Sequence, residues 1–335
     1  MKKIINQPTH FVDEMLEGIM LAHPDKVRLS KENDRVVLNA HEAKQGKVGI
    51  VTAGGSGHLP VFMGYVGDGL LDGCAIGNVF ASPSAGAMAT MLRECDHGAG
   101  VLCLYGNYNG DKLNFNMACE EVEFDDIKTK TVLVMDDVAS SPPEHADRRR
   151  GVAGMVFAFK AAGAAADKGL DLDGVAAAAQ MALDNTRTMG VALSACIVPE
   201  AGKATFSIKE DEIEIGMGIH GEPGIEVRKM MTADEIADLL VDKIDADMPL
   251  GKGDEVAVMV NGLGATPLEE QYIVYRRVYR KLEEKGVSVY MPHIGEFATS
   301  MEMAGMSLTI MKLNSELKEY LRAPACTPFY TNANK

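Results

Sequence analysis

Three glycine-rich segments of the chain carry residue types suited to acid–base or nucleophilic chemistry. They are Gly54–His58 (GGSGH), Asn107–Asp111 (NYNGD) and Gly218–Gly224 (GIHGEPG). A neutral imidazole can act as a nucleophile or a general base, and a carboxylate can take a proton from a hydroxyl. Because glycine permits unusual backbone conformations and close approach of a ligand, each segment is a candidate binding loop.

His220 has the most distinctive surroundings of these residues. Three glycines frame it, and Pro223 stiffens the turn that follows. This pattern predicts a histidine that is presented to a ligand and not packed in a core. A hairpin turn with a solvent-facing histidine would give the same pattern, so both interpretations stay open from this segment alone.

The other two loops also have simpler explanations. The GGSGH segment resembles a phosphate-binding nest, but the chain lacks the GxxxxGK[ST] signature and a GxGxxG motif in the appropriate setting. Asp111 could cap a helix that begins near Lys112, and His58 could be a structural turn residue. Neither loop is specific when taken alone.

Two charged clusters lie outside these loops. Asp136 and Asp137 could hold a metal ion, although carboxylates at a strand end are usually solvated, which is the interpretation we favour. Arg148–Arg150 forms a possible anion patch, for which an exposed helix flank or a docking surface for an acidic partner is the simpler explanation. The remaining histidines show no zinc-like spacing, so the sequence predicts no metal site.

The elements that position these loops alternate between strands and helices in the first half. Apolar runs predict strands over Lys47–Ala53, Gly100–Tyr105 and Lys130–Asp137. Helices are predicted over 7–22, up to about Arg93, from Lys112, and over 149–185 with a break at Gly169. This alternation indicates a parallel or mostly parallel sheet, in which ligands bind at the carboxyl ends of the strands.

The second half has a different pattern of closely spaced strands. Strands are predicted over 191–199, 204–208, 212–219, 255–260, 287–291 and 306–313, and helices from Thr232, over 268–285 and over 315–322. The change predicts two domains, 1–187 with the Gly-rich loop and Asp111, and 188–335 with His220. The expected fold class is α/β, with two domains of mixed or mostly parallel sheets flanked by helices.

Composition narrows the classes of function. A chain of 335 residues favours two domains, and its formal net charge of −15 disfavours nucleic acid and anionic membrane surfaces as partners. The six cysteines form no CxxC pair, and no apolar run reaches the roughly 18 residues of a membrane span. We therefore expect a cytoplasmic protein with reduced cysteines.

The motifs become specific when their order is considered. The chain contains GGSGH, FASP (Phe80–Pro83), NYNGD, GIHGEPG and NGLGATP (Asn261–Pro267) in this order. This series resembles the dihydroxyacetone-binding K subunit of phosphotransferase-system-dependent dihydroxyacetone kinases, from Asn6 to the Thr327–Pro328 tail. The resemblance implies two α/β domains with the substrate site between them.

The resemblance also implies roles for individual residues. His220 would hold the ketone covalently as a hemiaminal, which cannot lose water to form an imine and so stays reversible. Asp111 would be the general base for the terminal hydroxyl, and His58 its acid–base partner. The implied substrate contacts are Gly55, Ser56, Ser82 and the position of Gly106.

By the same resemblance, this chain would bind no cofactor itself. Mg-ADP or Mg-ATP would be held by a separate L subunit, and a phosphotransferase-system M subunit would rephosphorylate it in place. The K subunit is expected to be a homodimer. These expectations make the chain a kinase subunit that is active only with its L partner.

Two positions depart from the family pattern. Leu59 replaces the glutamate of a GHEP motif, and Gly106 replaces a lysine that contacts substrate. One hypothesis is a longer ketose such as erythrulose, and another is a paralogue that binds ketone as a sensor or coactivator through a transcription regulator. A third hypothesis is a phosphate- or dinucleotide-binding enzyme built on the Gly-rich loop, which tight binding of NAD or ATP by the isolated chain would support.

Overall fold

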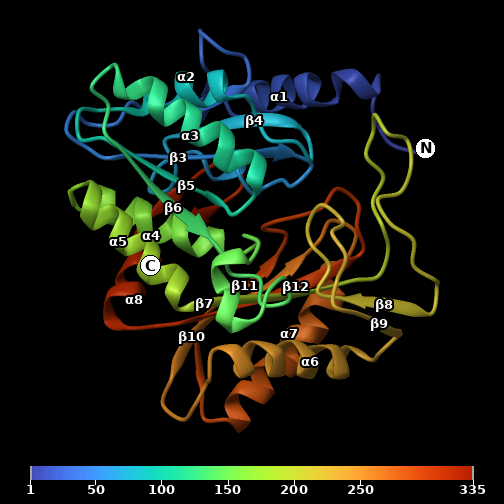
Figure 1. Cartoon of the computed structure of the whole chain (residues 1–335). Coiled ribbons are helices and arrows are strands. Elements are labelled where there is room, and N and C mark those ends of the chain that lie inside the picture. Colours follow the sequence, from blue (N-terminus) through green and yellow to red (C-terminus); the bar gives the residue numbers. More distant parts are fainter. Residues whose placement is uncertain (1, 334–335) are drawn as a thin grey trace. The chain divides into compact units, whose positions relative to one another are not determined.

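The computed structural model describes residues 2–333, which divide into two compact units (Figure 1). The first unit contains the described residues within Met1–Val134, Val156–Ala182 and Leu317–Lys335. The second unit contains Met135–Met155 and Leu183–Glu316. The sequence prediction divided the chain once, at residues 187 and 188. The structure differs because the chain passes between the units several times.

A six-stranded sheet forms the centre of the first unit. Its strands are β1 (Val27–Leu29), β2 (Val36–Asn39), β3 (Gly49–Ser56), β4 (Gly73–Val79), β5 (Val101–Gly106) and β6 (Thr129–Val134). The order is β1-β2-β4-β3-β5-β6. The four strands β4, β3, β5 and β6 are parallel, whereas β1 and β2 pair antiparallel at one edge. This half of the chain is therefore mostly parallel, as its alternating pattern predicts.

Helices cover both faces of this sheet, with α2 and α3 on one face and α4 and α5 on the other (Figure 1). The helices are α1 (Phe11–Ala22), α2 (Ala85–Cys95), α3 (Asn109–Glu123), α4 (Met155–Asp167), α5 (Leu172–Asp184) and α8 (Ser315–Arg322). Short 3₁₀ turns occur at Pro8–His10 and Met63–Tyr65, and a two-stranded ribbon pairs β13 (Ala325–Cys326) with β14 (Thr331–Asn332). Met88, Met91 and Phe115 are among the fully buried side chains that fill the core beneath α2 and α3.

The second unit also contains a six-stranded sheet, which is mostly antiparallel. Its strands are β7 (Thr186–Ala192), β8 (Glu212–Ile215), β9 (Glu226–Lys229), β10 (Glu255–Gly262), β11 (Ser288–Gly295) and β12 (Gly305–Lys312). In the order β11-β10-β12-β7-β8-β9, only β10 and β11 pair in parallel. Together the two sheets confirm the predicted α/β class with mixed sheets.

Two helices, α6 (Ala233–Asp247) and α7 (Leu268–Glu284), pack against the sheet of the second unit. The Thr232 hydroxyl accepts from the Glu235 amide, and the Glu235 carboxylate accepts from the Thr232 amide, so the predicted capping box is confirmed. Buried apolar residues such as Leu240, Val258 and Val278 join these helices to the strands.

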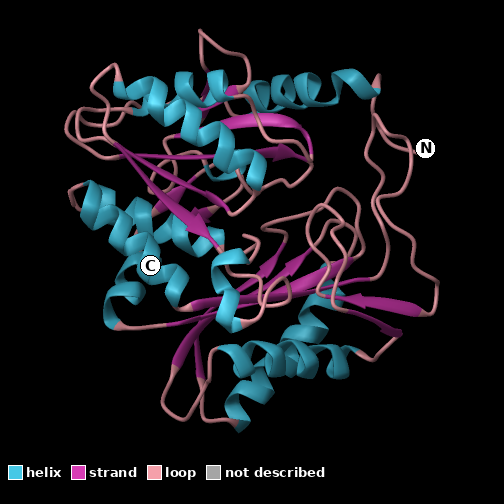
Figure 2. Cartoon of the chain, in the orientation of Figure 1, coloured by secondary structure: helices cyan, strands magenta, loops and turns pink. Residues whose placement is uncertain are grey.

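The structure differs from the sequence prediction between β7 and β8. Residues 204–208 form no strand, and Figure 2 shows this connection as loop. The run predicted over 212–219 ends at Ile215, because Gly216 adopts a φ of 79° and leaves the extended conformation. His220 therefore lies in a loop and not at a strand end. A further 3₁₀ turn occupies Pro143–Arg148.

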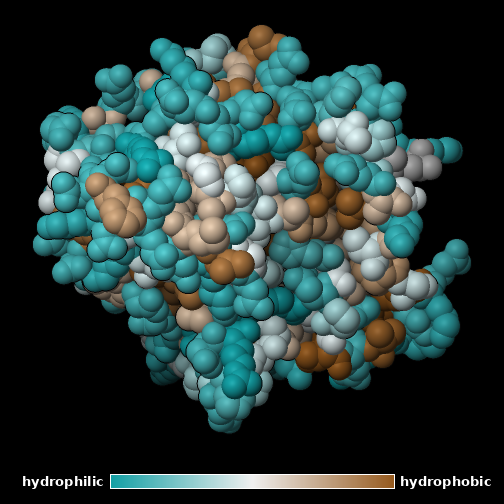
Figure 3. All heavy atoms as spheres, turned by 45° about the horizontal axis from the view of Figure 1, so that its top comes forward, coloured by the Kyte–Doolittle hydropathy of each residue, from teal (hydrophilic) through white to brown (hydrophobic). Residues whose placement is uncertain are grey.

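Hydrophilic residues cover most of the surface on the face that Figure 3 shows, and hydrophobic residues gather there only in small patches. Across residues 2–333, no helix is both long enough and apolar enough to cross a membrane.

Two of the three consecutive arginines are not surface residues, contrary to the prediction. Arg149 is only 1% exposed, and its guanidinium donates two hydrogen bonds to the Asp247 carboxylate, one of them at 2.9 Å. Arg187 pairs with the same carboxylate. Of the three arginines, only Arg148 is exposed. Ion pairs that are shielded from water cannot be recognised from a run of like charges, which explains the error.

Replacing Arg149 by alanine should destabilise the chain by about 3 kcal/mol, because removing one partner of a buried pair leaves a charge poorly compensated. Arg148→Ala is the matched control, and we expect it to change stability by less than about 0.5 kcal/mol. Urea unfolding followed by circular dichroism measures both variants. Equal effects of the two substitutions would contradict the assigned burial.

Candidate functional site

Three of the predicted segments follow adjacent strands in the first unit. GGSGH ends β3, FASP follows β4, and NYNGD follows β5. Because β4, β3 and β5 are parallel neighbours, the carboxyl ends of the three strands lie at the same edge of the sheet. The predicted clustering of these loops at one edge is therefore confirmed by the topology.

The GGSGH backbone lies directly against the FASP segment. A Cβ on Gly55 would lie 2.7 Å from the Ala81 amide nitrogen, and one on Gly77 would lie 1.8 Å from the Ala81 carbonyl oxygen. Only glycine permits this approach. The buried Ser56 hydroxyl donates to the Gly77 carbonyl at 2.8 Å. Ser56 thus stabilises the loop, while its contact with a substrate stays a prediction, as does that of Gly55.

His58 is 1% exposed and is held between two aromatic rings. Its imidazole stacks on Phe80, with centroids 4.8 Å apart, and meets Phe62 edge-on at 5.8 Å. Both phenylalanines have a positive φ, 60° and 72°, which is uncommon for a bulky residue and costs about 1–3 kcal/mol. The sequence analysis did not anticipate either ring contact: it named Phe80 only as part of the FASP motif, and Phe62 lies in an apolar run that indicates only a core.

Asp111 lies in the first turn of α3 and is 6% exposed. The helix begins at Asn109, so the proposed capping role is wrong: the N-cap position is Tyr108. The partial positive charge at a helix N-terminus stabilises a carboxylate in this position. Asp111 is thus a buried carboxyl group beside the N-terminus of α3.

The first turn of α3 also contacts the FASP segment. A Cβ on Gly110 would lie 2.5 Å from the Ser82 hydroxyl oxygen, and the Asn114 amide donates to the Pro83 carbonyl at 2.7 Å. Gly106 is the buried last residue of β5. The first unit thus brings Ser82, Asp111 and the GGSGH backbone to one sheet edge.

His220 lies in a tight turn of the second unit that Glu222 closes. One carboxylate oxygen of Glu222 lies 2.9 Å from the His220 ring nitrogen Nδ1, and the other accepts from the His220 amide at 2.9 Å. The Gly218 amide donates to the Glu222 carbonyl at 3.0 Å, and Gly221 adopts a φ of 83°. The imidazole side chain is 22% exposed, so it is neither packed in a core nor fully in solvent.

The Glu222 carboxylate determines the tautomer of this ring. Burial alone would raise the pKa of Glu222, but the hydrogen bond and charge of His220, with backbone hydrogen bonds, outweigh it and lower the pKa to about 2. An ionised carboxylate can only accept, so Nδ1 carries the proton. In the neutral ring this places the lone pair on Nε2, which is the nitrogen that can act as a nucleophile.

Position 218 must be glycine because the charged groups beside it leave no room for a side chain. A Cβ at this position would lie 2.1 Å from a Glu222 carboxylate oxygen and 2.4 Å from the Arg150 nitrogen Nη1. Arg150 also donates to the Gly216 carbonyl at 2.9 Å. The guanidinium therefore supports the turn that carries His220.

The predictions for Asp136 and Asp137 as solvated residues are wrong. Asp137 is 4% exposed and pairs with Arg150 at 2.7 Å; burial raises its pKa to about 6, against the effect of that cation. Asp136 is 1% exposed and accepts from the amides of Val152 and Gly154 at 2.8 and 2.7 Å. Both carboxylates hold the segment that contains Arg150.

Within the described part of the chain, no three potential metal ligands of the His, Cys, Asp or Glu type gather in one place.

Comparison with known proteins identifies the class to which this architecture belongs. Residues 17–329 match the Dak1 domain, and the chain therefore belongs to the Dak1 family. The resemblance inferred from the five motifs is confirmed.

Particular relatives cover nearly the whole chain. It is 45% identical, over 98% of its length and 99% of the relative's, to the dihydroxyacetone-binding subunit of PTS-dependent dihydroxyacetone kinase 2 from Listeria innocua. It is 43% identical to an L-erythrulose kinase from Pectobacterium atrosepticum, of which it spans 56%.

Solved structures show the same fold. The dihydroxyacetone kinase of C. freundii matches with a TM-score of 0.90 and 32% identity, covering 99% of this chain and 60% of that one. A dihydroxyacetone kinase operon co-activator matches with a TM-score of 0.87 and 33% identity, covering 93% and 96%.

The Glu222→Gln substitution should make stability less dependent on acid pH. Since the folded pKa of about 2 lies below the ordinary 4.5, the carboxylate contributes stability that is present above pH 4.5 and lost as the pH falls toward 2. Allowing for partial exposure, we expect the variant to lose about 1–2 kcal/mol near neutral pH. The difference from the wild type should shrink below pH 4.5 in urea unfolding.

The exposed Glu200 provides the control for this experiment. Glu200→Gln should leave the unfolding free energy unchanged across the same range. If the difference in unfolding free energy between the wild type and Glu222→Gln stays constant down to about pH 3, the assigned hydrogen bond is contradicted.

Proposed function

We propose that this chain is the substrate-binding subunit of a ketose kinase, which holds dihydroxyacetone or a related short ketose as a hemiaminal on His220. The observation that carries this proposal is the Glu222 carboxylate 2.9 Å from Nδ1 of His220, because it leaves a nucleophilic nitrogen on the opposite side of the ring. The 45% identity to a dihydroxyacetone-binding kinase subunit supports the same conclusion.

The covalent step follows from this tautomer. The Nε2 lone pair adds to the keto carbon, and the π electrons move to the carbonyl oxygen, which takes up a proton. The ring becomes positively charged, and the Glu222 carboxylate stabilises that charge through Nδ1–H. Because the adduct nitrogen carries no proton to eliminate with the hydroxyl, water is not lost and the bond remains reversible.

Asp111 and His58 serve the transfer step in this proposal. Asp111 takes the proton from the terminal hydroxyl as its oxygen attacks phosphorus. His58, fixed by Phe62 and Phe80, hydrogen-bonds the substrate and assists the proton transfer. Gly55, Ser56 and Ser82 border the ligand at the strand ends.

The phosphoryl group comes from a partner in this proposal. A separate L subunit holds the Mg-nucleotide, a phosphotransferase-system M subunit renews its phosphate, and the K subunit acts as a cytoplasmic homodimer. The relatives named as PTS-dependent dihydroxyacetone-binding subunits, of which this chain covers 94–99%, support the arrangement.

A second candidate is a ketone sensor that works through a transcription regulator. The similarity to a dihydroxyacetone kinase operon co-activator supports it. The identity to that protein is 33%, against 45% to the kinase subunit, and we therefore favour the kinase.

Intact-mass measurement with dihydroxyacetone should show the full mass of the ketose added to the wild-type chain, without loss of water. His220→Ala should abolish the adduct and keep the melting temperature within a few degrees, because this side chain is only partly buried. An adduct on the His220→Ala variant would refute the assigned nucleophile.

Adding an L subunit and a phosphoryl donor should produce ketose phosphate, whereas the chain with ATP alone should produce none. Asp111→Asn should keep the adduct and reduce turnover by about 10²–10⁴-fold, as expected for loss of a general base. An adduct without turnover in the wild-type complex would favour the sensor. Turnover by the isolated chain with ATP would exclude the partner-dependent scheme.

The Gly106→Lys substitution tests the identity of the ketose. A lysine at this buried strand end fills space and adds a donor, so it should favour dihydroxyacetone over the longer erythrulose. We expect the ratio of kcat/KM for dihydroxyacetone to that for erythrulose to rise at least about tenfold, equivalent to 1.4 kcal/mol. Gly106→Ala is the control for size alone, and an unchanged ratio in the lysine variant would contradict the inference.

A further inference from the structure

Two thiols meet between β5 and α3, the strand and helix that the NYNGD segment connects. The Cys103 sulfur on β5 lies 3.8 Å from the Cys119 sulfur on α3. The neighbouring Tyr105 ring stacks on Phe115, with centroids 4.1 Å apart and an angle of 16° between the planes. Cys103 and Tyr105 share one strand face, and Phe115 and Cys119 are one helical turn apart. The packing of the two elements therefore fixes the thiol contact.

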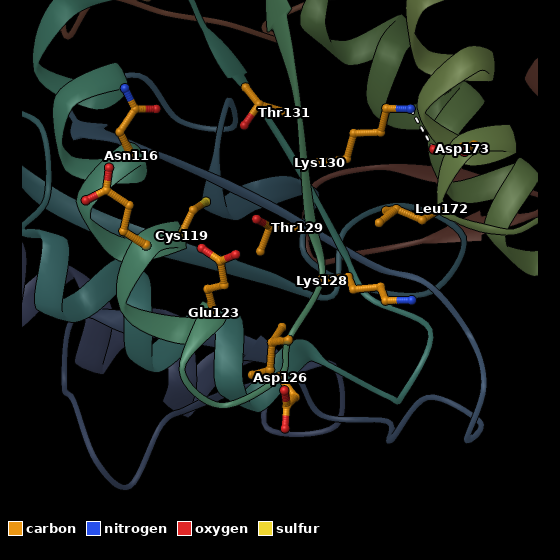
Figure 4. Close-up of a pocket in the computed structure, with 12 residues that line it drawn as sticks. Asn116, Cys119, Glu123, Asp126, Lys128, Thr129, Lys130, Thr131, Leu172 and Asp173 are labelled. Carbon is orange, nitrogen blue, oxygen red and sulfur yellow. Dashed lines mark hydrogen bonds and ion pairs between the residues drawn. The ribbon is translucent and has the colours of Figure 1, made fainter.

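The two thiols differ in their access to solvent. Cys103 is fully buried, whereas Cys119 is partly exposed on the wall of an open pocket of about 710 Å³. Figure 4 shows Cys119 projecting from α3, between Asn116 and Glu123, toward Thr129 and Thr131 on β6. A small polar reagent in this pocket reaches Cys119 first, and Cys103 lies behind it.

The pKa values of the two thiols are shifted in opposite directions. The hydrogen bond from Cys103, assisted by Thr129, lowers the pKa of Cys119 to about 7 against the effect of burial. The same bond, together with burial, raises the pKa of Cys103 well above its ordinary value. The outer thiol is therefore the nucleophile, since thiolates react and thiols do not.

We propose that Cys103 and Cys119 are a peroxide-sensitive thiol pair that closes a disulfide between β5 and α3. The Cys119 thiolate attacks a peroxide oxygen, the O–O bond breaks to give a sulfenic acid, and the departing hydroxide takes up the proton that the thiol released and becomes water. The Cys103 sulfur then attacks the Cys119 sulfur, and a second water leaves with the Cys103 proton. One peroxide thus oxidises two thiols, and a reducing thiol reverses the change.

The disulfide would act on the functional loop because of its place in the fold. Asp111, Phe115 and Cys119 follow one another at four-residue intervals and lie on the same face of α3. β5 ends at Gly106, immediately before the NYNGD loop. A covalent link at Cys119 would therefore join β5 to α3, whose first turn carries Asp111.

The test treats the purified full chain with hydrogen peroxide, then alkylates it in denaturant and measures its mass. We expect the loss of two alkylatable thiols and of two hydrogens, with a Cys103–Cys119 linked peptide identified by tandem mass spectrometry. The rate should rise as the pH increases through about 7. Cys119→Ser should abolish the disulfide, and the partly exposed Cys326 gives the control variant Cys326→Ser, which should retain it.

Three results would overturn the proposal: six free thiols after treatment, a disulfide that joins other cysteines, or Cys119 oxidised to the sulfinic acid while Cys103 stays reduced. Peptide mapping of the wild-type chain decides among them, so the test does not depend on the folding of a Cys103 variant. The readout is also independent of ketose binding, which remains measurable on the reduced chain.

Discussion

The hydrogen bond between Glu222 and His220 is the interaction on which the proposed function depends. It aligns the imidazole, fixes the position of its proton and holds the turn through the second carboxylate oxygen. Burial works against the ionised carboxylate, but the ring and the backbone amides outweigh it. A protonated carboxyl group could instead donate to Nδ1 and leave the ring proton on Nε2, so the low pKa of Glu222 favours the tautomer with the lone pair on Nε2.

This turn is supported by a second layer of charged groups. Arg150 bonds the Gly216 carbonyl and pairs with Asp137, while Asp136 accepts from two amides and from Thr188. These buried contacts explain why Met135–Met155 belongs to the second unit although the chain around it belongs to the first. Removing water from such pairs makes them costly to break, and so they hold the loop in one arrangement.

The sequence was sufficient where local patterns determine structure. Apolar runs predicted β3, β5 and β10, and the capping box predicted the start of α6. Glycines followed by polar residues predicted the loops at the strand ends. The sequence was insufficient where a residue's interaction partner is distant along the chain. Asp247 is 98 residues from Arg149, so nothing near that arginine indicates burial. The stacking of Phe80 on His58 was not anticipated for the same reason, because the two residues are 22 positions apart and meet only when β3 pairs with β4.

The small size of the proposed ligand explains why the proposed site needs this rigidity. Dihydroxyacetone has about six non-hydrogen atoms, so its non-covalent contacts can supply at most about 9 kcal/mol under the best known ratio per atom. Orienting it must then rely on groups that are already fixed before it binds. The proposed reversible bond to His220 would add affinity without more contact area, and it requires an imidazole that already has the correct tautomer and direction. In the proposed site the glycines would bring backbone atoms near the ligand, and the aromatic rings restrict His58. In such a site, the fixed positions of the binding groups compensate for the contact area that a larger substrate would bury.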